Sequence, residues 1–395
     1  MDRQGIDAID PPFGRKTTAP TSPSRTAMSE DRHSRPPASD GRTGSVTVPT
    51  NVAIPDTGPA RFLRYFIRRC VQEPQLLLDG VLAIGTPRVT YLDLAGGPSK
   101  SVIIFSSRRS GSTLLGELLV QHDRQRFMFE PFWNAAVGEA RDFEPGRFED
   151  PESDDPELNR LLATVLSGMV RNLHVDRYNK SRLPRGRVIK DVRATNLAPY
   201  LAAHFPEVPL ILLLRHPLAT AHSAVGLGWM DDLEMFLQQD ELITGPFAEQ
   251  APLIESVAAR EHHMVIRFVL QWCLENYLPL HMLSRSSTHV IFFEDLMRSG
   301  EAELDRLAGF LRRRSPDLWS SWRPDAVLLS RPSASSRRRD DGWPSQEQLR
   351  NGWRDAIAPA QLERSLEILE AFGLDRLFSA GADPLVGVDE VLITP

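Results

Sequence analysis

Residues 101–119 read SVIIFSSRRSGSTLLGELL, and this stretch decides the fold of the 395-residue chain. The run 101–105 is continuously apolar and rich in β-branched residues, which predicts a buried strand. Leucines recur on one face from Ser112 onward, which predicts a helix over 112–122. A tight loop of small residues with one glycine joins the two. Such a turn presents backbone N–H groups and a helix N-terminus to an anion, so the stretch predicts a phosphate-binding loop.

Short apolar runs alternate with helical patterns along the rest of the chain. Strands are predicted at 187–190, 208–214 and 288–293, and a long helix is predicted at 261–283. Two late helices are predicted, at 345–357 and 358–374. Continuously apolar strands separated by helices are typical of a parallel sheet covered on both faces. The sequence therefore predicts an α/β fold with a central parallel sheet flanked by helices.

The N-terminal part of the chain differs in composition from the rest. Residues 1–58 are rich in Pro, Ser, Thr, Asp and Arg and are predicted to be a disordered tail. A single α/β domain is predicted over 59–395. Its first segment, ARFLRYFIRRCVQ at 60–72, has the pattern of an amphipathic helix with a basic face. We expect this helix to pack on the domain; a helix lying on a membrane surface is the alternative.

Charge and cysteine content exclude several classes of protein. The chain carries 46 basic and 52 acidic residues, so no basic surface for nucleic acid is expected. The only cysteines, Cys70 and Cys273, lie far apart and lack metal-ligand spacing, so no metal is expected and a reducing cytoplasm fits best. The N-terminus has no apolar signal region, and no run approaches the ~20 apolar residues of a transmembrane segment. The oligomeric state is left open.

The loop differs from the nucleoside triphosphate pattern G-x-x-x-x-G-K-[ST] at a decisive position. Ser106 takes the place of the first glycine, Gly111 that of the second and Thr113 that of the final hydroxyl residue. Ser112 stands where the lysine that reaches the β- and γ-phosphates belongs. Positive charge is found earlier in the loop, at Arg108 and Arg109. The loop is therefore poorly equipped for ATP or GTP.

The sequence RRSGSTLL instead resembles the 5′-phosphosulfate loop of sulfotransferases that use 3′-phosphoadenosine 5′-phosphosulfate (PAPS), closest to their carbohydrate and bacterial branches. The resemblance implies a P-loop-type three-layer fold and PAPS as co-substrate, with no metal. It places Arg109 against the sulfate and the bridging oxygen. The residues implied in holding the nucleotide at this end are Arg108, Arg109, Ser110, Gly111, Ser112 and Thr113. A purely structural strand-to-helix turn is the alternative.

A second element resembles the 3′-phosphate site of the same family. LILLLRHPLATAHSAV at 210–225 is a strand ending in Arg215, with Ser223 eight residues later, although His216 replaces the usual aspartate. A guanidinium and a hydroxyl so placed can converge on one phosphate; an arginine that caps carbonyl groups is the alternative. Weaker similarity is found at 290–296, 330–345 and 351–357, where Ser336 and Arg338 are implied to contact the nucleotide. The resemblance covers about 101–378.

The acceptor proton needs a base, and the sequence offers few. In VIKDVR, Lys190 matches the family's lysine, but Val192 stands where a catalytic histidine belongs in one branch. Glu130, in RFMFEPFW, resembles the glutamate base of the carbohydrate branch, and its apolar neighbours are expected to raise its pKa. A glutamate paired with a loop arginine is the alternative, and Asp191 is a competing base. Lys190 is implied as a second charge on the leaving phosphate.

The resulting hypothesis is a cytoplasmic enzyme that moves a sulfuryl group from PAPS to a hydroxyl or amine. The acceptor, a carbohydrate, lipid or other small molecule, is expected to contact residues 132–187 and 226–262, which carry no recognisable signal. A P-loop kinase or NTPase is the first alternative, with Glu294 and Asp295 imitating a magnesium-binding acid. A non-catalytic module that kept the nucleotide fold is the second.

Overall fold

The computed structural model describes residues 91–120, 124–336 and 344–392. The predicted tail at 1–58, the start of the domain at 59 and the predicted helix at 60–72 lie outside these residues. Within them, five strands form one parallel sheet in the order β2-β3-β1-β4-β5. The strands are β1 (Ser101–Ser106), β2 (Gln125–Phe129), β3 (Gly186–Asp191), β4 (Leu210–Leu214) and β5 (Thr288–Phe292).

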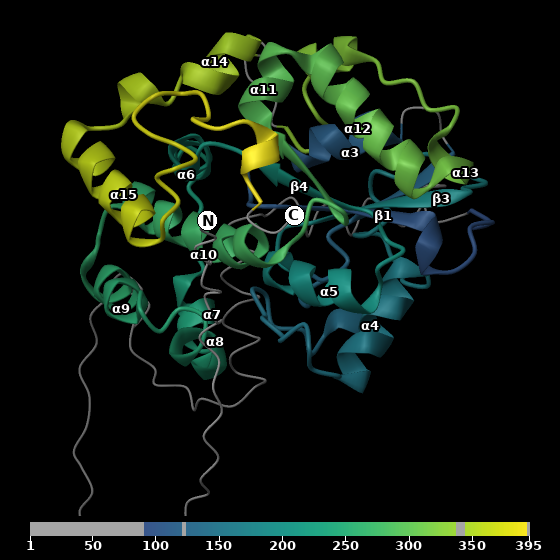
Figure 1. Ribbon diagram of the computed structural model, residues 1–395, viewed down its shortest axis with the longest axis horizontal. Coiled ribbons are helices and arrows are strands. Elements are labelled where there is room, and N and C mark those ends of the chain that lie inside the picture. The colour runs from purple at the N-terminus through teal and green to yellow at the C-terminus, as the bar shows by residue number, and fades with distance from the viewer. Residues whose placement is uncertain (1–90, 121–123, 337–343, 393–395) are drawn as a thin grey trace, which may run out of the picture. The chain divides into compact units, whose positions relative to one another are not determined.

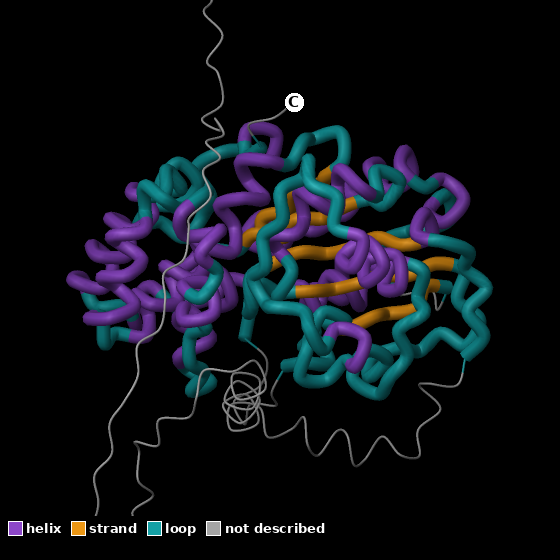
Figure 2. Tube along the Cα trace, turned by 90° about the horizontal axis from the view of Figure 1, so that it is seen from below, coloured by secondary structure: helices purple, strands orange, loops and turns teal. Residues whose placement is uncertain are grey.

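Helices cover both faces of this sheet, so side chains on the strands are buried on both faces. On one face, Ile103 and Phe105 belong to a core that includes residues of α5 (Ala198–His204), α10 (Met264–Met282) and α15 (Pro359–Ala371). On the other face, Val102 and Ile104 pack with α3 (Ser112–Leu119), α11 (Phe293–Arg298) and α12 (Gly300–Arg314). Figure 1 shows α3, α11 and α12 above the strands and α5 and α10 below them, and Figure 2 shows the strands side by side. The predicted three-layer α/β fold is confirmed.

The remaining α-helices of the described residues are short. They are α4 (Pro156–Leu166), α6 (Pro217–Val225), α7 (Leu233–Leu237), α8 (Asp240–Thr244), α9 (Ala251–Arg260), α13 (Pro316–Trp319) and α14 (Gln346–Asn351). The predicted helix at 345–357 is wrong in its second half, where α14 ends and a 3₁₀ turn follows at Arg354–Ala356. Trp353, between the two, is buried in the core, so tertiary packing overrides the helical pattern there.

The order of the strands decides where a ligand site can form. The central strand, β1, has β2 and β3 on one side and β4 and β5 on the other, so the strand order reverses direction at β1. Ligands of open parallel sheets bind at the carboxyl ends of the strands at such a switch point. The register brings Phe105 level with Asp191, and Phe129 level with Lys190. The predicted loop, Lys190 and Glu130 therefore share one edge of the sheet.

Neither a membrane-spanning helix nor a group of metal ligands is found among the described residues. None of their helices combines the length and the apolar character that crossing a membrane requires. No three His, Cys, Asp or Glu side chains among them are grouped as ligands of a metal ion.

Candidate active site

The loop between β1 and α3 is shaped to hold an anion. The hydroxyls of Ser106 and Ser110 are buried there and have no hydrogen-bond partner among the described residues. Gly111 has φ 91°, and a Cβ atom at this position would lie 2.6 Å from the ring of Phe293, so the turn requires glycine. Together with the N-terminus of α3, these groups fit a phosphate. The predicted anion-binding residues follow one another through this turn: Ser110, Gly111, Ser112 and Thr113.

The two predicted halves of the nucleotide site meet in space. The Nε atom of Arg109 donates a hydrogen bond of 3.1 Å to the hydroxyl of Ser223 on α6. Arg215, directly after β4, donates from Nη1 to the backbone carbonyl of Arg109 at 2.8 Å. The loop after β1 and the segment after β4 therefore lie together at the switch point of the sheet.

Arg215 itself caps carbonyl groups, the alternative expected for a strand-end arginine. Its Nη2 donates to the backbone carbonyl of Leu349 at 2.6 Å, and its guanidinium lies 4.4 Å from the centre of the Phe293 ring. Its Nε is buried and has no partner among the described residues. Burial lowers the pKa of Arg215 to about 10, which leaves it charged at neutral pH. The side chain thus holds the loop in place and retains one donor that faces no acceptor.

A second group of charged residues lies at the same edge of the sheet, and we call Glu130, Lys190 and Arg193 the Glu130 cluster. Glu130 directly follows β2. Lys190 Nζ donates to its Oε1 at 2.5 Å, and Arg193 Nη1 donates to its Oε2. The Glu130 backbone N–H also donates to the carbonyl of Lys190 at 2.7 Å. All three residues are buried, so this carboxylate is held by two cations away from water.

The charges in the Glu130 cluster reverse one prediction. Burial would raise the pKa of Glu130, but the charges of Arg193 and Lys190 outweigh it and hold this pKa well below its usual range. The prediction of a raised pKa for Glu130 is wrong because cationic side chains lie against the rings of its aromatic neighbours. Lys190 Nζ lies 4.6 Å from the centre of the Phe129 ring, and the Arg193 guanidinium lies 4.8 Å from that of Trp133.

Comparison with known proteins identifies the family. Residues 101–317, more than half of the chain, match the model of a family described as the sulfotransferase family. The chain belongs to the sulfotransferase family. The predicted family and enzyme class are thereby confirmed.

Other comparisons gave more distant matches. No curated protein sequence matches the chain. Among solved structures, a sulfotransferase domain from the curacin biosynthetic pathway is 18% identical, covering 71% of this chain and 99% of its own, with a TM-score of 0.34. A sulfotransferase from Alicyclobacillus acidocaldarius is 17% identical, covering 68% and 95%, with a TM-score of 0.31. A mouse sulfotransferase complexed with PAP is 12% identical, covering 70% and 85%, with a TM-score of 0.32.

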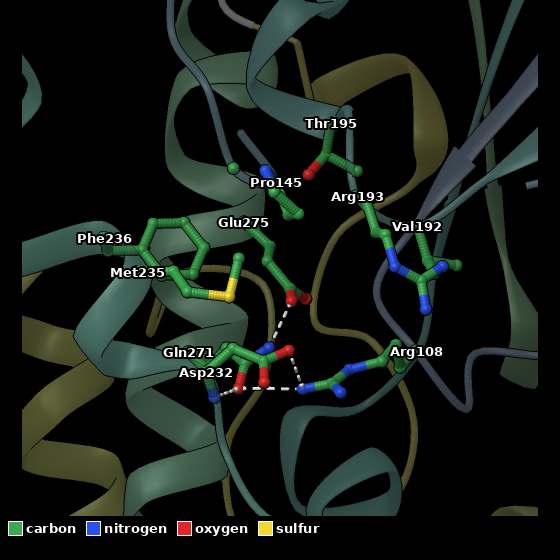
Figure 3. Close-up of a pocket in the computed structure, with 11 residues that line it drawn as sticks. Arg108, Pro145, Val192, Arg193, Thr195, Asp232, Met235, Phe236, Gln271 and Glu275 are labelled. Carbon is green, nitrogen blue, oxygen red and sulfur yellow. Dashed lines mark hydrogen bonds and ion pairs between the residues drawn. The ribbon is translucent and has the colours of Figure 1, made fainter. Parts of the chain in front are cut away.

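Arg108 has a different environment from Arg109 in this sulfotransferase. Its Nη2 lies 3.1 Å from Gln271 Oε1 and 3.0 Å from a carboxylate oxygen of Asp232. Figure 3 shows Arg108 beside Gln271 and Asp232, where it lines a pocket whose opposite wall includes Phe236. The predicted role of Arg108 in holding the nucleotide stays a prediction, but its contacts in the structure belong to this pocket.

The late Ser/Arg-rich segment is described only in part. The Ser336 hydroxyl lies 2.9 Å from that of Ser333, and the backbone N–H of Ala334 donates to Glu117 on α3 at 2.8 Å. The segment therefore contacts α3, the helix that begins at the predicted phosphate-binding loop. Arg338 lies outside the described residues, so its predicted contact with the nucleotide stays a prediction.

Asp191, the competing base, has a structural role in the sulfotransferase. Its carboxylate accepts backbone N–H groups from Phe132 at 3.1 Å, Arg193 at 2.7 Å and Ala194 at 3.2 Å. Burial raises the pKa of Asp191 to about 6. These hydrogen bonds fix the turn after β3, and with it the position of Arg193.

No sequence pattern predicted a role for His174, whose ring lies 4.6 Å from that of Trp133. Arg177 Nη2 lies 2.6 Å from His174 Nδ1. Because a guanidinium only donates, Nδ1 accepts, and the neutral ring carries its proton on Nε2. Burial, helped by the charge of Arg177, holds the pKa of His174 well below its usual value. Nε2 is buried without a partner among the described residues.

The other missed residue, Arg193, had a detectable signal. It lies three residues after Lys190 in VIKDVR, at the carboxyl end of a predicted strand. The family resemblance singles out Val192, because a histidine belongs there in one branch. The position at the end of a predicted strand is enough to make Arg193 a candidate site residue as well.

His216 and Glu294, at the ends of β4 and β5, are also structural in this sulfotransferase. His216 Nδ1 accepts the N–H of Leu218 and caps α6, and its ring stacks on Trp353 with centroids 4.3 Å apart. Glu294 Oε1 accepts the His216 N–H at 2.9 Å. The family's aspartate is thus replaced by a buried cap, and Glu294 ties two strand ends together.

Proposed function

We propose that this sulfotransferase moves the sulfuryl group of PAPS to a hydroxyl or amine of a carbohydrate, lipid or other small molecule, with Glu130 as the general base. The contact between Arg109 and Ser223 carries this proposal, because it joins the predicted 5′-phosphosulfate loop to the predicted 3′-phosphate element. PAPS bears phosphate groups at both ends of one adenosine. Cationic and hydroxyl side chains are the groups that bind such phosphates.

The reaction is an in-line displacement at sulfur. The acceptor oxygen or nitrogen forms a bond to sulfur, the bond between sulfur and the bridging oxygen breaks, and 3′-phosphoadenosine 5′-phosphate (PAP) leaves with that electron pair. The acceptor proton passes to the carboxylate of Glu130. Arg109 and Lys190 stabilise the negative charge that grows on the bridging and sulfuryl oxygens.

The surroundings of Glu130 support its assignment as the base. The other possible bases already accept hydrogen bonds. Asp191 accepts three backbone N–H groups, and His174 Nδ1 accepts a hydrogen bond from Arg177. The low pKa keeps Glu130 in its proton-accepting form at neutral pH. If Lys190 turns toward the leaving phosphate, one of the two cations that lower this pKa is withdrawn and the carboxylate becomes more basic.

A thermal-shift experiment with PAP, ATP–Mg²⁺ or no ligand tests the donor side. PAP at about a hundred times its Kd adds about 2.7 kcal/mol of stability. Stabilisation by ATP–Mg²⁺ alone would favour a kinase or NTPase, and none by either would favour a non-catalytic module. Glu130→Gln keeps the PAP shift and loses PAPS turnover, whereas Arg215→Ala weakens the shift. The cytoplasmic location stays a prediction.

A further inference from the structure

The pocket in Figure 3 adjoins both parts of the proposed site. Arg193, which holds Glu130, lines it on one side, and Arg108, which precedes Arg109 in the phosphate-binding loop, lines it on another. Apolar side chains of Met235 and Phe236 form the opposite wall. The pocket is partly open to solvent and its enclosed part is small, so only a small portion of an acceptor can enter it.

Among the described residues that line this pocket, Glu275 has an exceptional charge environment. Arg108 pairs with Asp232 at 3.0 Å, and Arg193 pairs with Glu130. Glu275 is 6% exposed and forms no ion pair with any described residue. Its carboxyl accepts hydrogen bonds from Gln271 Nε2 at 2.6 Å and from the Ser107 hydroxyl, and burial raises its pKa. It is therefore a buried hydrogen-bond acceptor whose nearest countercharge, that of Arg108, is shared with Asp232.

This balance of charges selects among acceptors. An ammonium group in the pocket would meet the guanidiniums of Arg108 and Arg193. A carboxylate, phosphate or sulfate would meet the acidic side chains of Asp232 and Glu275. A hydroxyl group can donate to a carboxylate and accept from a guanidinium, so it suits both kinds of neighbour. The apolar wall suits an uncharged carbon skeleton.

We infer, on the basis of the proposed function, that this pocket binds the acceptor, and that the acceptor is an uncharged molecule with a hydroxyl that donates to Glu275. The inference narrows the hydroxyl-or-amine acceptor to alcohols. It also assigns Arg108, together with Asp232 and Gln271, to the acceptor side of the site.

The first experiment uses the wild-type protein and PAPS with two scaffolds, a methyl glucoside and a phenylethanol. Each is supplied in an uncharged, an amino-substituted and a carboxyl-substituted version, and PAP release is measured. At least one uncharged version is expected to have a kcat/KM about tenfold or more above its charged versions, since each like-charge contact is unfavourable. Faster turnover of a charged version overturns the inference, as does failure to turn over either uncharged version.

The second experiment compares Glu275→Gln with Glu255→Gln, a matched change at an exposed position on α9. Glu275→Gln is expected to raise the KM of the best uncharged acceptor about tenfold and to leave the PAP thermal shift unchanged, because a hydrogen bond to a charged group becomes one to a neutral group. An unchanged KM overturns the inference. Absence of a PAP shift in the wild type would instead refute the proposed function. The acceptor series decides the matter even if Glu275→Gln fails to fold.

Discussion

The buried carboxyl of Glu294 should make the enzyme less stable as the pH rises from about 4.5 to about 7. Glu294 is fully buried and accepts the His216 N–H at 2.9 Å. Burial raises the pKa of Glu294 from 4.5 to about 7, and the hydrogen bond from His216 and the charge of Arg215 oppose it only in part. Between these pH values the folded protein keeps a proton that the unfolded chain has lost. The stabilisation is therefore complete below pH 4.5 and disappears as the pH passes 7.

The size of the effect follows from the two pKa values. Between pH 5 and pH 8, Glu294 alone should remove about 2.5 kcal/mol from the free energy of unfolding. Glu294→Gln has no proton to lose, and its amide oxygen can still accept the His216 N–H. Urea unfolding at both pH values should therefore show Glu294→Gln gaining about 2.5 kcal/mol on the wild type, with the exposed Glu255→Gln as control. Parallel pH dependences of Glu294→Gln and the wild type would refute this reasoning.

Three further predictions concern the loop, the core and the buried histidine. Gly111→Ala should weaken PAP binding at least about tenfold by calorimetry, because φ 91° and the Phe293 ring leave no room for a Cβ atom. Arg126→Met should cost about 3–5 kcal/mol of unfolding free energy, since it strands a buried carboxylate, whereas Arg364→Met on the surface should cost less than about 1 kcal/mol. His174 should stay neutral with its proton on Nε2 from pH 5.5 to 8 by nitrogen NMR; a titration near 6.5 would contradict its lowered pKa, and a proton on Nδ1 would contradict its assigned tautomer.

The parts of the fold that are determined locally could be predicted from the sequence. Strand β1, its loop and α3 form one contiguous pattern, and β4 is a plain apolar run. Strand β2 was missed because it begins with Gln125 and Arg126, polar residues that rarely mark a buried strand. The Arg126 guanidinium is accommodated by Asp176 at 2.7 Å and by the carbonyls of Gly168 and Val170. Those partners lie 42 to 50 residues away, so no local pattern announces them.

The site divides in the same way. The spacing from Arg215 to Ser223 and the RRSGST loop predicted the proposed donor side, because both are short motifs tied to strand ends. The protonation of Glu130 could not be predicted, since Arg193, which contributes most to lowering its pKa, is 63 residues further on. The neighbouring aromatic residues suggested an apolar site. Only the fold shows that Lys190 and Arg193 lie against the faces of these rings.

The backbone shows that the site is formed by the fold itself. Arg109 and Glu130 are the non-glycine residues with positive φ among those described, at 68° and 48°. Each such conformation costs about 1–3 kcal/mol and persists only where surrounding contacts hold it. The contacts that hold Arg109 come from Arg215 and Ser223, and those that hold Glu130 come from Lys190 and Arg193. The same hydrogen bonds that assemble the two halves of the site thus stabilise its strained backbone, so loss of any one partner should disturb geometry as well as charge.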